Sequence, residues 1–132
     1  MADVNRGNRP LSPFMIGQYY RPQITSVSSI MVRITGIALL CLSILPVAWL
    51  LAASGSGSAF AGWDGFLRSW FGYLIMLGAL WAMFYHLLGR LRHVIWDLGY
   101  GLDLEISRKM GMGMFVLATV LTVLVVLGFL IF

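Results

Sequence analysis

The stretch MGMGMFVLATVLTVLVVLGFLIF, at residues 110–132, decides the class of this chain. It carries no charged side chain. A helix rises 1.5 Å per residue, so about 20 apolar residues cross the roughly 30 Å hydrocarbon core of a bilayer. Lipid offers no hydrogen-bond partners, and a single segment can satisfy its own backbone only as a helix. The stretch therefore predicts a membrane-spanning helix.

Two further apolar runs precede it, at residues 34–53 and 70–89. Of the 132 residues, 60% are hydrophobic and only 11% are charged, whereas a soluble domain carries about 25% charged residues. We therefore predict an all-α membrane protein and exclude a soluble domain. Three transmembrane helices, at about 29–53, 66–96 and 108–132, would run up, down and up.

The basic residues between the spans predict the orientation. Residues 1–28 read as an N-terminal tail, and Ser54–Ser58 (SGSGS) as a flexible connector. Basic residues are concentrated before the first apolar run (Arg6, Arg9, Arg21 and Arg33) and between the second and third runs (Arg90, Arg92, Arg108 and Lys109). Cytoplasmic loops carry such an excess, so we expect a cytoplasmic N-terminus and a periplasmic C-terminus. This clustering does not suit a nucleic-acid partner. The short tail contains Asp3, which favours a bacterial inner membrane over a mitochondrial transit peptide.

Ionisable residues within a span are costly and indicate a functional site. His86 and His93 are seven residues apart, which places them on one helical face, and Asp97 falls on the same stripe. Arg90 lies about 40° from His86. Haem iron accepts an axial imidazole, and a nearby arginine can pair with haem propionates. The histidines are about 10.5 Å apart along the axis, so they cannot ligate the same haem, and one ligand must come from another chain.

Depth separates the two histidines. His86 lies among apolar neighbours, whereas His93 lies next to Arg92 and close to Asp97. A buried imidazole needs a partner, so we predict His86 as the iron ligand. His93, Arg90 and Arg92 would surround the haem, and Tyr85 and Asp97 are possible supporting residues. The alternative is that these side chains are interfacial and reach lipid headgroups.

The first span begins with a second polar group. Ser29 and Arg33 are i, i+4 neighbours, and Ser26 lies on the same face. A cation beside hydroxyls near the interface suits a quinone carbonyl. The alternative is an N-cap serine with a topology-determining arginine.

Five motifs together resemble a known family. They are RPLSP at 9–13, YRPQ at 20–23, SIMVRITG at 29–36, YH at 85–86 and RHVIWDLG at 92–99. This combination is similar to the cytochrome b subunit of succinate dehydrogenase, respiratory complex II, and the resemblance covers nearly the whole chain.

The resemblance implies a heterotetramer in which a flavoprotein oxidises succinate and an iron–sulfur protein carries electrons to the membrane. Two small anchors, of which this chain resembles the larger, would form a heteromeric helix bundle, share haem b and bind ubiquinone. His86 matches the haem ligand, with the other ligand on the second anchor. Ser29 and Arg33 match the quinone-site residues. The chain alone is not expected to be catalytic.

Three positions depart from the family pattern. Val32 and Phe14 stand where the family usually has histidine, and Arg90 stands where it often has glycine. If the histidine at 32 normally supports a haem propionate or a proton path, either Arg90 substitutes for it or that support is absent. Two alternatives remain: a cofactor-free structural anchor, and the anchor of a related fumarate reductase. A b-type visible spectrum would separate haem binding from the cofactor-free alternative.

Overall fold

The computed structural model describes residues 14, 16, 17 and 20–131. The RPLSP motif, Arg6, Arg9 and most of the predicted tail lie outside this part. The described residues form five helices and no β-strand, in the order α1 (Ile24–Leu42), α2 (Ile44–Gly55), α3 (Gly57–Leu67), α4 (Trp70–Asp97) and α5 (Leu104–Ile131).

Three helical segments are long and apolar enough to cross a membrane: Ile24–Gly55, Trp70–Asp97 and Leu104–Ile131. The predicted all-α class and the three membrane helices are therefore confirmed. The first helix begins at Ile24, before the expected residue 29, so the end of the predicted tail is helical. The link between the last two spans shortens to 98–103 because α5 already begins at Leu104.

The first span consists of two helices, with a break at Ser43. Pro46 has no N–H and cannot donate to the carbonyl of Leu42, four residues earlier. The Ser43 hydroxyl donates to the Leu40 carbonyl at 2.6 Å. The proline therefore accounts for the division between α1 and α2.

The predicted connector at 54–58 is wrong in extent. Ser54 and Gly55 belong to α2, and Ser56 alone separates α2 from α3. The Ser56 hydroxyl accepts from the N–H of Ala59 at 3.2 Å, a favourable N-cap that starts a new helix. Rings of Trp49 and Phe60, 5.6 Å apart, pack α3 against α2. The expected helix at 66–96 begins at Trp70 instead.

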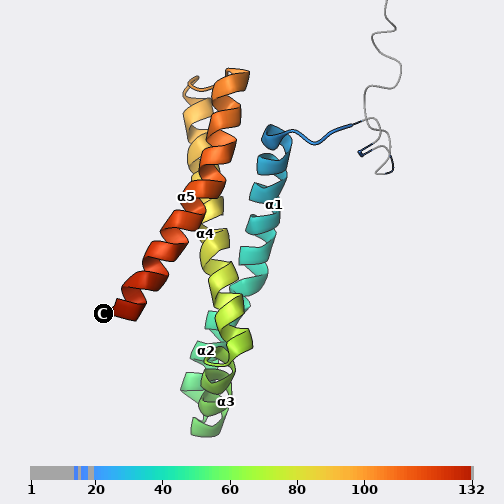
Figure 1. The fold of residues 1–132 in the computed structure, drawn as a ribbon. Coiled ribbons are helices and arrows are strands. Elements are labelled where there is room, and N and C mark those ends of the chain that lie inside the picture. Colours follow the sequence, from blue (N-terminus) through green and yellow to red (C-terminus); the bar gives the residue numbers. More distant parts are fainter. Residues whose placement is uncertain (1–13, 15, 18–19, 132) are drawn as a thin grey trace, which may run out of the picture.

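Figure 1 shows α1, α4 and α5 side by side where α1 begins and where α4 is joined to α5. We call this the charged end. The hairpin of α2 and α3 lies at the opposite end, which we call the hairpin end. The C-terminal half of α5 leans away from α4 (Figure 1). Consecutive spans run in opposite directions, as predicted.

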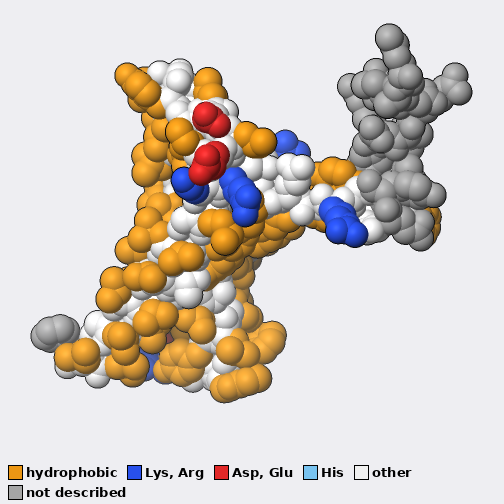
Figure 2. Space-filling model, turned by 45° about the horizontal axis from the view of Figure 1, so that its top comes forward, with side chains coloured by type: hydrophobic (Ala, Val, Ile, Leu, Met, Phe, Trp, Pro, Cys, Tyr) orange, Lys and Arg blue, Asp and Glu red, His pale blue; other side chains and the backbone are white. Residues whose placement is uncertain are grey.

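The core lies between α1, α4 and α5. It contains Val32, Tyr85, Met114 and Ala118, all at most 5% exposed. Large apolar side chains cover the outside of the bundle, as lipid or other membrane helices require (Figure 2). Acidic and basic side chains gather near the charged end in the same view.

Candidate functional site

His86 lies on α4, half-buried against α1. Its Nδ1 lies 2.9 Å from the carbonyl oxygen of Val32. A carbonyl can only accept, so Nδ1 carries the hydrogen and Nε2 carries the lone pair. Nε2 accepts from Nε of Arg90 at 3.2 Å. The imidazole is therefore neutral, and its tautomer leaves Nε2 as the nitrogen able to ligate a metal.

Two glycines make room for this contact. A Cβ on Gly36 would lie 2.7 Å from His86 Cε1, so only a glycine lets the imidazole sit against α1. A Cβ on Gly89 would collide with the side chain of Val32. Small residues at helix contacts let backbones approach closely in membranes. The Val32 side chain thus packs against Gly89, and its backbone carbonyl accepts the hydrogen bond from His86.

Arg92 faces a different side of α4 from His86. It is only 4% exposed and lies between α1 and α5 rather than beside His86. Its Nη1 donates to the hydroxyl of Ser28 at 2.8 Å and lies 3.6 Å from the Met114 sulfur. Its guanidinium carbon lies 4.2 Å from the centre of the Trp96 ring. Arg90 and Arg92, predicted together around a haem, therefore have separate environments.

Ser28 accepts hydrogen bonds at the point where α1, α4 and α5 meet. It is fully buried, and its hydroxyl donates to the Thr25 carbonyl at 3.0 Å. The Tyr85 hydroxyl donates to the Ser28 carbonyl at 3.2 Å. A Cβ on Gly111 would lie 3.1 Å from the Ser28 hydroxyl, so the glycine brings α5 close. Between described residues the ion pairs are Arg68–Asp64 and Lys109–Glu105, so Arg92 has no carboxylate partner there.

The remaining predicted residues are not joined into one cluster by hydrogen bonds. Ser29 is half-buried and Arg33 is exposed, one turn apart on α1. Ser26 pairs with the Tyr20 hydroxyl at 2.8 Å. Asp97 ends α4, exposed. The His93 ring meets Trp96 edge-on at 5.3 Å.

Sequence reasoning missed Ser28 and Gly111. Ser28 stands beside a serine already chosen for its spacing from Arg33, and Gly111 lies in a methionine–glycine run that resembles ordinary packing. The missed signal is the spacing Ala82, Tyr85, Gly89, Arg92, a 3-4-3 pattern that marks the buried face of α4.

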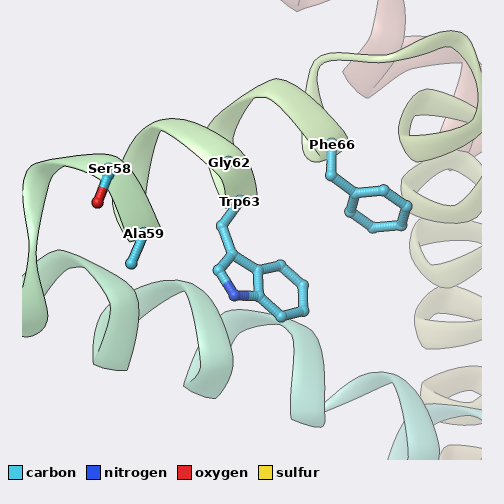
Figure 3. Close-up of a pocket in the computed structure, with 5 residues that line it drawn as sticks. All are labelled: Ser58, Ala59, Gly62, Trp63 and Phe66. Atoms are coloured by element: carbon cyan, nitrogen blue, oxygen red, sulfur yellow. The ribbon is translucent and has the colours of Figure 1, made fainter.

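A hollow on α3 lies far from His86, at the hairpin end. Ser58, Ala59, Gly62, Trp63 and Phe66 line it, and in Figure 3 Trp63 projects from α3 towards α2. The lining contains no ionisable side chain. The described residues also contain no group of three or more His, Cys, Asp or Glu side chains that could hold a metal ion.

Comparisons with known proteins show the family of this chain. Residues 5–126 match the family described as the succinate dehydrogenase/fumarate reductase transmembrane subunit. The chain belongs to that family. The succinate dehydrogenase cytochrome b556 subunit of Paracoccus denitrificans is 48% identical over the full length of both chains. The cytochrome b560 subunit of Reclinomonas americana is 40% identical over 104 residues, 74% of this chain and 70% of the relative.

A more distant relative is the b556 subunit of Rickettsia conorii. It is 32% identical over 116 residues, 88% of this chain and 89% of the relative. The resemblance inferred from the motifs is thus confirmed. The chain is a succinate dehydrogenase cytochrome b membrane subunit by family, and such a subunit works in a membrane complex of an oxidoreductase.

Proposed function

We propose that this chain holds one face of a haem b through His86 and forms part of a ubiquinone-reduction site through Ser29 and Arg33. The proposal assigns it to the larger membrane anchor of succinate:quinone oxidoreductase. A flavoprotein, an iron–sulfur subunit and a second small anchor would be its partners. The observation that carries the proposal is the hydrogen-bond pattern of the His86 imidazole, in which Nδ1 donates to the Val32 carbonyl and Nε2 is the nitrogen able to ligate iron.

The donor set fits a haem. A ligating histidine usually donates its other ring nitrogen to a carbonyl or carboxylate, which fixes the tautomer. The Val32 carbonyl occupies that position for His86, and Gly36 gives the ring its space. The Nε2 lone pair of His86 is shared only with the exposed Arg90 side chain, and we expect the other iron ligand to come from the partner anchor. Haem b would supply a one-electron carrier beside the quinone site.

Arg90 donates to the same nitrogen that iron would take. Because Nε2 cannot serve both, the Arg90 guanidinium would pair with a propionate in the haem-loaded protein. Arg90 then supplies a positive charge where the family often has glycine. This exchange concerns only an exposed side chain and leaves the α1–α4 contact unchanged.

Ser29 and Arg33 would present donors to one quinone carbonyl. Arginine remains protonated throughout turnover. Where water is scarce, its charge stabilises the negative charge that develops as a quinone is reduced. The positive-inside rule places these residues near the cytoplasmic surface, the side on which an iron–sulfur subunit would dock.

The histidines provide the test. We expect His86→Leu, assembled with its partner subunits, to lose the low-spin b-type spectrum because the iron loses its ligand. His93→Leu should perturb the spectrum without abolishing it, since that ring contacts Trp96. The opposite pattern would reject His86 as the ligand. A wild-type complex without b-type absorption would favour the cofactor-free anchor.

A further inference from the structure

We infer that Arg92 is a positioning residue for the quinone site, acting through Ser28 on the first turns of α1. This inference rests on the proposed function of Ser29 and Arg33. It gives Arg92 a task different from haem support, and the geometry of the charged end carries it.

The first observation is that two side chains of α4 donate hydrogen bonds to Ser28. Arg92 donates to its side chain, and Tyr85 donates to its backbone carbonyl. Both donors come from α4, two turns apart, so they hold α1 against α4 at one level of the bundle. A hydrogen bond with a charged donor is stronger than a neutral one, and low polarity around it increases the electrostatic contribution.

The second observation is the lack of a competing partner. Arg92 is 4% exposed and, among described residues, pairs with no carboxylate. Its contacts are Ser28, the Met114 sulfur and the face of Trp96. A buried cation whose acceptors are few remains where those acceptors are, because leaving them unpaired is costly. The guanidinium and Ser28 therefore hold each other in place.

The third observation is the rotation of α1. Successive helical residues are about 100° apart, so the inward direction of Ser28 fixes the directions of Ser29 and Arg33 on the same rigid helix. Ser28 is fully buried, whereas Ser29 is half-buried and Arg33 is exposed, as this rotation requires. If Ser28 lost its partner, α1 could turn or slide, and the two quinone-site donors would no longer converge on one oxygen atom.

The test uses the whole complex with a short-chain ubiquinone. Arg92→Gln removes the charge, and Ser28→Ala removes the acceptor without altering Ser29. Either change should raise the KM for ubiquinone about tenfold, the effect of losing one charge-assisted hydrogen bond. Haem content and succinate oxidation by an artificial acceptor should change less than about twofold. Arg92→Lys, which keeps a charged donor, should restore part of the affinity.

Lys109→Gln serves as the matched control. Lys109 is an exposed cation on the first part of α5, paired with Glu105, and its loss should leave the KM unchanged. An unchanged KM in Ser28→Ala would overturn the inference, even if Arg92→Gln failed to assemble. Parallel losses of haem and quinone affinity would also overturn it, since they indicate general disruption of packing. An Arg33→Leu complex with normal quinone reduction would reject the proposed function itself, and this inference with it.

Discussion

The two ends of the bundle are held together by different means. At the charged end, Arg92, Tyr85 and His86 of α4 reach α1 through hydrogen bonds of 2.8–3.2 Å. At the hairpin end, aromatic rings such as Trp49 and Phe60 make the contacts. The splayed half of α5 borders an apolar cavity of about 690 Å³ there, lined by Tyr73, Met76, Leu77, Leu80, Val125, Val126, Phe129 and Leu130.

This difference shows where the helix positions are determined. Apolar side chains gain little by choosing each other over lipid, so close packing and polar contacts between helices set the geometry in a membrane. The charged end has both, and the hairpin end has mainly apolar contacts. Substitutions at the charged end should therefore alter function and stability, while comparable substitutions at the hairpin end should be tolerated.

The largest expected effect is an all-or-none reporter signal that shows which side of the membrane each end of the bundle faces. The distribution of basic residues predicts that the charged end is cytoplasmic. A reporter active only in the cytoplasm should be silent when fused after Phe132 and active when fused before Met1. Strong activity from the C-terminal fusion would reverse the assignment of both ends.

The next largest effect is expected for Arg33→Leu. Quinone reduction should fall about 100-fold, because an oriented donor to developing negative charge is lost. Succinate oxidation with an artificial acceptor should be nearly intact. Arg68→Leu, which removes an exposed arginine near the hairpin end, should retain both activities. Equal loss of both activities in Arg33→Leu would indicate failed assembly instead.

A glycine pair compares the packing of the two ends directly. Gly89→Ala forces a Cβ into Val32, whereas Gly78→Ala, nearer the hairpin end, meets nothing within 4 Å. Overpacking costs about 1–3 kcal/mol, so the apparent Tm of the complex should fall by several degrees for Gly89→Ala. Alanine favours a helix, so Gly78→Ala should leave the Tm unchanged or raise it. Similar Tm values for the two variants would contradict the difference between the ends.

The smallest effect is expected for Arg90→Leu. The variant should still contain haem, because the Val32 carbonyl continues to orient His86. Removing a nearby positive charge favours the oxidised haem, so its midpoint potential should fall by about 40 mV, which corresponds to about 1 kcal/mol. Spectroelectrochemistry of Arg90→Leu and Arg90→Lys measures this. A raised potential in Arg90→Leu would contradict the predicted charge effect.

The sequence predicted the spans well because their length and lack of charge are local properties. It did not predict α3, since a serine–glycine run reads as a connector and the contact of Phe60 with Trp49 depends on the folded hairpin. At the site, the spacing predicted that His86 and His93 share one face of α4, and in the structure His86 contacts α1 while His93 contacts Trp96. The prediction grouped Arg90 with Arg92, although residues two positions apart on a helix point about 200° apart, and the structure buries only Arg92, between α1 and α5.

The acceptor that holds His86 belongs to the main chain. No change of side chain at position 32 can delete the Val32 carbonyl, although the new side chain must still fit beside Gly89. A substitution at position 32 therefore leaves the acceptor that orients the imidazole in place. Position 32 can be changed to other small apolar residues while the imidazole keeps its tautomer.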